Sequence, residues 1–387
     1  MRWGRRARPM VYLVGTCGFP NYGDELITRT WLNYLAAVAP RAEVWVDCHS
    51  PGPAQAVFAA SHPHVRFTDL LWRTCWAAPS ERPADIVEHV GRAVRHLGVV
   101  PRLDVARAAL RRADVVHLIG GGYVNTRWPK HLGLLAGAVE LARESGGVAA
   151  MTGQGLQPLS EEAAPLVAEL ATALAVADVR DAPSREVLGA GPEAGVSLTG
   201  DDSFLDLGHR TFDRRESPDV MLCAQSDLLT TSVEELAALF TTVLTGWGVE
   251  SERVGWFEAN PGGDRVVYDI VTETIPGIRF YPLLESWRAG LPARTGQRWL
   301  STRFHPHLVA AAAGSWGIAV PVNRGYYDHK HDSLVAQGSG WTVLEPTAAL
   351  SAAAVPQPPS SPAGFGDRLR DHVAAKRAVA EAVYGRL

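Results

Sequence analysis

Short apolar runs that alternate with helix-like segments constrain most strongly how this chain can fold. Strand-like runs occur at Met10–Gly15 and Glu43–Asp47, and between them Asp24–Ala39 carries apolar residues at helical spacing. The alternation continues with a helix-like segment at His131–Ser145 and with strand-like runs at Val115–Ile119, Val148–Thr152, Val176–Arg180 and Ser197–Thr199. This βα alternation predicts a parallel sheet with helices covering both faces.

The pattern restarts after a polar stretch, which predicts a second domain. Val220–Ala224, Val233–Thr245 and Arg253–Phe257 repeat the order strand, helix, strand, and Gly325–His331 has the composition of a polar loop. Further strand-like runs are Arg279–Tyr281, Trp299–Ser301, Ile318–Val320 and Trp341–Val343. Because 387 residues exceed one ordinary core, we expect an α/β fold of two Rossmann-like doubly wound domains facing across a cleft.

The expected boundaries follow changes in composition. They give a basic leader at 1–9, a first domain at 10–206, a linker at 207–218, a second domain at 219–350, and a Pro/Ser/Ala-rich tether with a C-terminal helix at 351–387. The leader has no apolar run of secretory length, which favours a disordered leader over a signal peptide.

Charge and cysteine content exclude several classes of protein. A net charge of -4 gives no support for nucleic-acid binding. No segment approaches the roughly 20 apolar residues that span a bilayer, although peripheral contact with a membrane surface stays open. The four cysteines form no CxxC pair, which predicts reduced thiols in the cytoplasm and no zinc site.

Three glycine-rich segments follow predicted strands and are candidate binding loops. In Gly15–Glu25 backbone N–H groups can approach an anion closely. Asn21 is its better ligand candidate, whereas Asp24 could simply cap the following helix. Gly120–Asn125 has three consecutive glycines, which mark either a close approach or a tight packing turn. In Thr152–Leu159 only Gln154 is a candidate for binding.

Two charged segments could carry chemistry. Arg180 ends a strand, where it could bind an anion or pair structurally with Asp181. Ser301–His307 and Asp328–His331 together supply an arginine, a lysine and up to four imidazoles. Arginine binds planar anions, and histidine moves protons near neutral pH. These residues predict a site for an anionic substrate with acid–base chemistry, unless they are merely a solvated loop.

Taken in order, six segments resemble the polysaccharide pyruvyl transferase family. They are N-Y-G-D-E (Asn21–Glu25), G-G-G-Y (Gly120–Tyr123), G-Q-G-L-Q-P-L (Gly153–Leu159), V-R-D-A-P-S (Val179–Ser184), G-D-D-S-F (Gly200–Phe204) and S-T-R-F-H (Ser301–His305). The family usually has Arg-Leu-His where this chain has Arg-Phe-His, and Asp328–His331 matches its lysine-bearing loop only loosely.

The resemblance implies a GT-B-like fold and a reaction. Such an enzyme transfers pyruvate from phosphoenolpyruvate onto two hydroxyls of a carbohydrate or glycosylated small molecule as a cyclic ketal. Phosphate is released, and phosphoenolpyruvate serves as co-substrate without any further cofactor or metal. The first domain would bind the acceptor and the second the donor.

The resemblance also implies roles for particular residues. His305 matches the active-site histidine, and Arg180 and Arg303 match donor-binding arginines, to which Lys330 could add a third positive charge. A buried phosphate and carboxylate need such cations. The general base is open, with Asp24, Asp202 and His307 as candidates. Gly121 and Gly122 are placed on the donor side. The expected acceptor contacts are Asn21, Asn125, Gln154 and Trp128, the last of which could equally be core.

Two other functions fit the same residues. A GT-B glycosyltransferase using a nucleotide sugar shares the fold and the need for cations. A non-catalytic glycan-binding protein would keep the fold without the chemistry.

Overall fold

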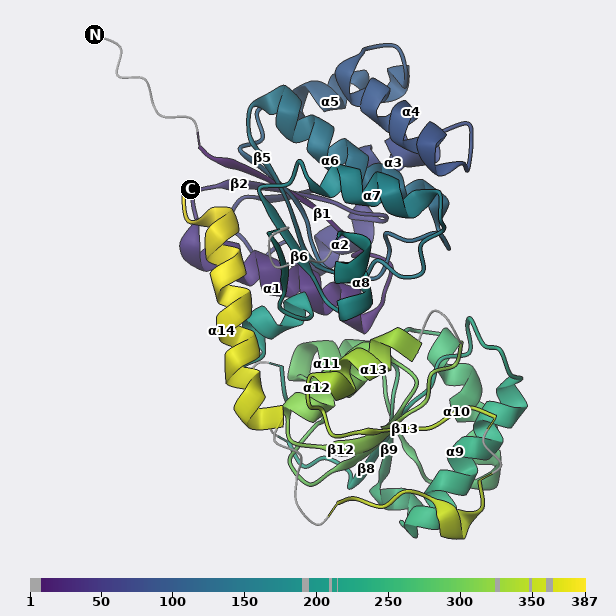
Figure 1. Cartoon of the computed structure of the whole chain (residues 1–387). Coiled ribbons are helices and arrows are strands. Elements are labelled where there is room, and N and C mark those ends of the chain that lie inside the picture. Colours follow the sequence, from purple (N-terminus) through teal and green to yellow (C-terminus); the bar gives the residue numbers. More distant parts are fainter. Residues whose placement is uncertain are drawn as a thin grey trace. The chain divides into compact units, whose positions relative to one another are not determined.

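The computed structural model describes residues 8–189, 195–208, 211–213, 215–323, 328–347, 350–359 and 365–387 (Figure 1). The chain divides into two compact units. The first comprises Met1–Phe19, Asp24–Asp206 and Val373–Leu387, and the second comprises Pro20–Gly23 and Leu207–His372. Each unit has its own parallel sheet. Most of the expected leader, 1–9, lies outside the described residues.

The first unit is built on a parallel sheet in the order β3-β2-β1-β4-β5-β6-β7. Its strands are β1 (Met10–Val14), β2 (Glu43–Asp47), β3 (Val65–Thr68), β4 (Val115–Leu118), β5 (Val148–Gln154), β6 (Val176–Val179) and β7 (Val196–Leu198). The strand order reverses between β1 and β4. Ligands of doubly wound folds bind beyond the carboxyl ends of the strands at such a reversal, and the loops that follow β1 and β4 here are glycine-rich.

Helices cover both faces of this sheet. They are α1 (Tyr22–Val38, within this unit from Asp24), α2 (Pro51–Phe58), α3 (Leu70–Trp76), α4 (Pro83–Arg95), α5 (Asp104–Leu110), α6 (Leu132–Ser145), α7 (Ala163–Ala171), α8 (Ala182–Val187) and α14 (Phe365–Tyr384, from Val373). α6 packs against β4 and β5, and α4 packs on α6.

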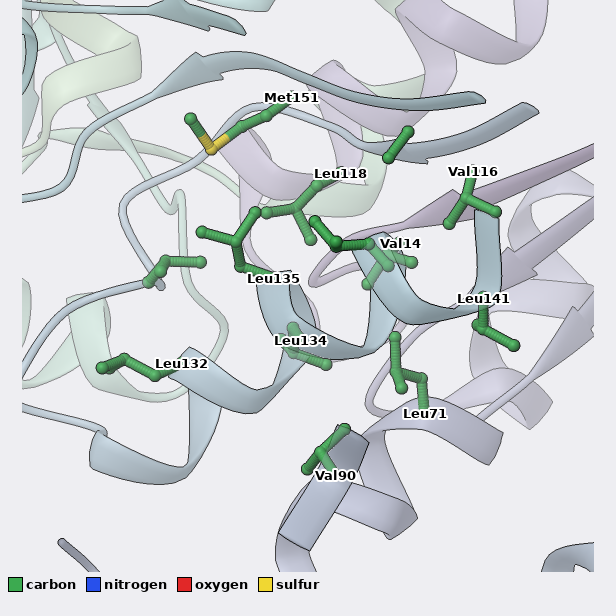
Figure 2. Packing of buried hydrophobic residues seen from close by; sticks show 14 of the residues in the cluster. Val14, Leu71, Val90, Val116, Leu118, Leu132, Leu134, Leu135, Leu141 and Met151 are labelled. Atoms are coloured by element: carbon green, nitrogen blue, oxygen red, sulfur yellow. The ribbon is translucent and has the colours of Figure 1, made fainter. Parts of the chain in front are cut away.

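β4 shows how the sheet is buried on both sides. Val116 and Leu118 point to the apolar core that Leu134 and Leu135 of α6 complete (Figure 2). Because side chains alternate along a strand, His117 points to the opposite face. Its ring meets Trp31 of α1 with the ring centres 4.6 Å apart.

The second unit repeats the plan. Its sheet runs β10-β9-β8-β11-β12-β13, and all pairs are parallel. The strands are β8 (Val220–Cys223), β9 (Val254–Phe257), β10 (Arg279–Tyr281), β11 (Arg298–Ser301), β12 (Trp316–Ala319) and β13 (Thr342–Val343). The helices are α9 (Val233–Trp247), α10 (Gly263–Thr274), α11 (Leu283–Ala289), α12 (Phe304–Ala312) and α13 (Asp328–Ala336). Here the order reverses between β8 and β11.

The predicted fold class of two doubly wound parallel sheets is confirmed. One local prediction is wrong. Gly325–His331 was expected to be a polar loop, but Asp328–His331 forms the first turn of α13, and residues 325–327 lie outside the described residues. The helix forms here because it lets Leu334 of α13 pack into the core of the second unit.

Candidate functional site

Gly120 after β4 and Gly153 near the end of β5 let the side chain of Asp202 approach the backbone. Gly120 N–H donates to Asp202 Oδ2 at 2.8 Å. A Cβ on Gly120 would lie 2.9 Å from Asp202 Cγ, and one on Gly153 would lie 2.4 Å from Asp202 Oδ1. Both distances are shorter than ordinary carbon contacts, so glycine is needed at each position.

Gly121 joins the two glycine loops of the first unit. Its φ is 145°, and a Cβ there would lie 2.6 Å from the Tyr123 ring. The Gly121 carbonyl accepts the Gly155 N–H at 2.8 Å. The tight packing turn considered for this segment is therefore present, and donor binding by Gly121 and Gly122 stays a prediction.

Arg180 follows β6 and is buried, with 3% of its surface exposed. Its guanidinium lies against Gly155, where a Cβ would be 2.2 Å from Nη2. Arg180 Nη1 is 3.6 Å from Asp201 Oδ2, and Nε is 3.7 Å from Asp181 Oδ2. Asp181 also caps α8 by accepting the Ser184 N–H at 2.9 Å. Two carboxylates thus place negative charge beside this buried guanidinium.

A buried lysine bridges two further aspartates of the first unit. Lys376 Nζ of α14 donates to Asp178 Oδ2 at 2.6 Å, to Asp202 Oδ1 at 3.1 Å and to the Gly200 carbonyl at 2.7 Å. Burial lowers the pKa of Lys376, but attraction to the two carboxylates outweighs burial, and the pKa is raised. Lys376 therefore stays charged.

His117 extends this network as a neutral imidazole. Thr152 Oγ1 donates to Asp202 at 2.6 Å, so it accepts from His117 Nε2 at 2.8 Å, and His117 Nδ1 then accepts the Tyr384 hydroxyl at 2.6 Å. Burial lowers the pKa of His117 to about 4. Asp202, a candidate base, is used in this structural network.

The predicted acceptor residues of the first unit lie around the same glycine loops. Asn125 is buried and closes its own turn, donating to the Gly122 carbonyl at 2.8 Å and accepting the Arg127 N–H at 2.9 Å. Gln154 is also buried and donates through Nε2 to the Ile119 carbonyl, while its Oε1 has no hydrogen-bond partner among the described residues. Trp128 is half-buried and stacks on His131 with ring centres 5.8 Å apart.

The first turn of α1 in this unit carries two carboxylates. Asp24, the predicted base, is half-buried. Glu25 is buried, and its Oε1 accepts the Gly18 N–H at 2.9 Å. Burial raises the pKa of Glu25 to about 7, although the bond from Gly18 opposes this rise. Glu25 thus holds the Gly15–Phe19 loop in place.

In the second unit, Arg303 stands at the end of β11 with 8% of its surface exposed. Its Nε donates to Asp264 Oδ1 at 3.1 Å, and its Nη2 donates to Asp264 and, at 3.3 Å, to Asp227. Asp264 is itself fixed, because its Oδ2 accepts the N–H groups of Ala259 and Asn260 at 2.9 and 3.0 Å. Burial raises the pKa of Asp264 despite the attraction of Arg303. The side chain of Asp227, in contrast, is about half exposed.

His305 lies on the first turn of α12 against the N-Y-G segment. A Cβ on Gly23 would be only 1.8 Å from His305 Nδ1, so the absence of a side chain at Gly23 makes room for the imidazole. Tyr22 holds this segment in the second unit, since its N–H donates to the Ala259 carbonyl at 2.8 Å and its ring meets Phe257 edge-on. Asn21 accepts the Gly23 N–H at 3.0 Å. Two segments that are far apart in the sequence therefore meet at His305.

Two further histidines of this region, His307 and His331, pair with each other inside the second unit. His307 and His331 are fully buried and share a hydrogen bond between their Nδ1 atoms at 3.1 Å. His331 Nε2 donates to the Thr302 carbonyl, so its Nδ1 accepts from His307. Burial lowers the pKa of His331 to about 4, and it also lowers the pKa of His307 well below the usual value of a histidine. Lys330, next to this pair on α13, is half-buried.

Sequence comparison decides the family. A sequence model of the polysaccharide pyruvyl transferase family matches residues 21–236, more than half of the chain. The chain belongs to the polysaccharide pyruvyl transferase family. Family membership indicates a transferase. The matched region contains the segments from Asn21–Glu25 to Gly200–Phe204 and ends before Arg303 and His305. A search of curated protein sequences found no match to this chain.

Solved structures similar to this pyruvyl transferase family member share its GT-B-like fold. A Listeria monocytogenes protein described as a UDP-N-acetylglucosamine 2-epimerase is 13% identical, with 97% of each chain covered and a TM-score of 0.54. The glycotransferase of kitacinnamycin is also 13% identical, with 98% of each chain covered and a TM-score of 0.56. At such identities the likeness shows the fold alone.

The structure adds residues to the candidate site that sequence reasoning missed. Lys376, Asp178, Asp264 and Glu25 each fix a motif residue or loop, but their positions carry no local pattern that separates them from ordinary charged residues. Within the ranges that the structure describes, no group of three or more His, Cys, Asp or Glu side chains is arranged to hold a metal ion. Nor does any described helix have the length and apolar character to cross a membrane.

Proposed function

We propose that this chain transfers pyruvate from phosphoenolpyruvate to two hydroxyls of a sugar, in a glycan or a glycosylated metabolite, and forms a cyclic ketal. A proton adds to the methylene carbon of phosphoenolpyruvate, which becomes the methyl group and leaves C2 electrophilic. One hydroxyl attacks C2 and the C2–O bond to phosphate breaks. The second hydroxyl then closes the ring. The hydroxyls lose two protons, of which one replaces the proton consumed and the other leaves with phosphate.

The contact between Gly23 and His305 is the observation that carries this proposal. N-Y-G lies in the region that matches the family, and its glycine leaves space for the imidazole that we assign as the general acid. A half-buried histidine near neutral pH can hold and deliver a proton, and general acid catalysis of this kind contributes about 10²–10⁴-fold.

Arg303 is the proposed cation for the donor. Asp264 holds one edge of the guanidinium through Nε and Nη2, which orients the group. Asp227, the more exposed carboxylate, is the partner that an incoming phosphate or carboxylate would displace. Lys330 is proposed to add positive charge in the second unit.

The other assignments stay proposals of the same kind. Arg180, Gly121 and Gly122 are assigned to the anionic donor, because a buried guanidinium suits an anion and because Gly121 and Gly122 follow β4, where the strand order reverses. Asp24 is the proposed base for the sugar hydroxyl. The proposed acceptor contacts are Asn21, Asn125, Gln154 and Trp128.

The first test is thermal protection of the whole chain by phosphoenolpyruvate and, separately, by UDP-sugars. Protection by phosphoenolpyruvate is expected, because a ligand that binds only the folded state raises the melting temperature. Protection by UDP-sugars in its place would favour a glycosyltransferase and would overturn the proposal.

The second test measures transfer itself by mass spectrometry of candidate acceptors and by release of phosphate. His305→Ala should keep protection by phosphoenolpyruvate and lose about 10²–10⁴-fold in transfer rate. His96→Ala, which removes an exposed histidine, is the matched control and should leave the rate unchanged. Full activity of His305→Ala would exclude His305 as the general acid.

A further inference from the structure

Aromatic side chains gather beyond β1 and β2 of the first unit and leave ring surface open to solvent. Phe19 exposes 60% of its surface and Trp76 exposes 37%, and exposed His49 lies between them. The His49 ring is 5.8 Å from Phe19 and 5.0 Å from Trp76, and buried Trp72 lies behind it at 5.9 Å. We call Phe19, His49 and Trp76 the aromatic ledge.

The backbone that carries Phe19 is fixed. A Cβ on Gly18 would be 2.1 Å from the Ser50 carbonyl, so the Phe19 loop lies directly on the start of α2. The Gly18 N–H is also bound by Glu25. The exposure of Phe19 on a loop held in this way is not explained by packing within the described residues of the first unit.

The Trp76 side of the ledge is fixed as well. Asp47 Oδ2 accepts the Leu71 N–H at 2.7 Å and thereby anchors the start of α3. Trp72 Nε1 donates to the Gly15 carbonyl at 3.0 Å, and Lys130 Nζ donates to the Trp76 carbonyl at 3.1 Å. The loops after β1, β2 and β4 thus meet around one rigid aromatic surface.

The size and chemistry of the ledge indicate its ligand. Its two apolar rings expose on the order of 200 Å², well below the about 800 Å² that each partner buries in a stable protein interface. A sugar ring has an apolar C–H face, which stacks on aromatic rings, and a rim of hydroxyls that needs polar neighbours. His49, Ser50 and Lys130 supply such neighbours here, and His49 Nδ1 already lies 2.8 Å from Ser50 Oγ.

We propose that the aromatic ledge binds a sugar ring of the acceptor by stacking, with Phe19 and Trp76 as the contact surfaces. This assignment rests on the proposed function only in calling the sugar an acceptor. The ledge lies beyond the carboxyl ends of parallel strands, where doubly wound folds bind their ligands. Sugar binding by the ledge does not require phosphoenolpyruvate.

Calorimetric titration of the full chain tests the ledge without phosphoenolpyruvate. The probes are oligosaccharides that end in galactose, glucose, mannose or N-acetylglucosamine. At least one should bind the wild type, and Phe19→Ala and Trp76→Ala should each weaken that binding by about tenfold, which corresponds to 1.4 kcal/mol. Leu97→Ala, which removes an apolar side chain that is 70% exposed elsewhere in the unit, should bind like the wild type.

Protection by phosphoenolpyruvate, measured on the same variants, separates the two proposals. Unchanged sugar affinity in Phe19→Ala and Trp76→Ala, or no binding by any probe, would overturn the ledge while protection by phosphoenolpyruvate kept the proposed function. Sugar binding that depends on Phe19 without any protection by phosphoenolpyruvate would support the ledge and count against pyruvyl transfer. Light scattering that showed a dimer dissociated by Phe19→Ala would instead make this surface a subunit interface.

Discussion

Replacing Lys376 by methionine should destabilise the first unit strongly. Methionine fills much of the same volume, so the main loss is the charge that lies between Asp178 and Asp202. All three side chains are fully buried. Removing one partner of a buried ion pair costs about 3–5 kcal/mol, because the remaining charge stays buried without compensation. For a unit of this size, 1 kcal/mol lowers the melting temperature by about 2–4 °C.

The expected loss is therefore about 6–20 °C in the transition of the first unit, followed by calorimetry or by far-ultraviolet circular dichroism. Arg377→Met is the matched control, since it removes a positive charge from the next, exposed position of α14. Its effect should stay within about 0.5 kcal/mol.

A double variant locates the cause. Adding Asp202→Asn to Lys376→Met removes one of the two uncompensated carboxylates, so the combined loss should be smaller than the sum of the single losses. A melting temperature of Lys376→Met within 2 °C of the wild type, or strictly additive losses, would refute this reasoning.

Three further variants test other parts of the structure. Gly23→Ala should displace the His305 ring and lower the transfer rate by about 10²–10⁴-fold, while phosphoenolpyruvate still raises the melting temperature. Gly52→Ala is the control and should be active, because a Cβ there meets nothing within 4 Å. An active Gly23→Ala would contradict the role of His305. Asp227→Asn should bind phosphoenolpyruvate several-fold more tightly in a titration, because it removes the carboxylate that competes for Arg303, and weaker binding would speak against this competition. Glu25 has a pKa raised to about 7, so the native state favours its neutral form and loses stability as pH rises from about 4.5 to about 7. Glu25→Gln should therefore match the wild type near pH 4.5 and exceed it by up to about 3 kcal/mol above pH 7, and an equal difference at both pH values in thermal melts would exclude this effect.

Most of the strands and the glycine-rich loops could be predicted from sequence because their signals are local. Val115–Leu118 and Val220–Cys223 are short apolar runs that end in glycine-rich or polar loops, and their length together with the following loop identifies them as strands. α3 and β3, between residues 65 and 76, were missed. β3 is only partly buried and lies at the sheet edge, so it carries a weak apolar pattern.

The contacts within the site depend on positions that sequence spacing does not encode. The need for glycine at Gly155 comes from the guanidinium of Arg180, which lies 25 residues away in the sequence. The charge of the buried Asp202 is compensated by Lys376, which follows after 174 residues. Asp264 could not be told from a surface aspartate, because α10 begins at an ordinary Gly-Asp step. Motif recognition found Arg303 and His305 but not the carboxylates that orient the arginine.

The position of Lys376 in the chain has a consequence for how this protein is made. A ribosome adds roughly 5–20 residues per second, so Asp202 is synthesised roughly 10–35 s before the lysine that neutralises it. During that time all strands of the second sheet are synthesised, and the buried ion pairs of Lys376 with Asp178 and Asp202 can form only afterwards. A fragment cut at Asp206 would therefore lack a component of its own interior, because the first unit is assembled from residues at both ends of the sequence.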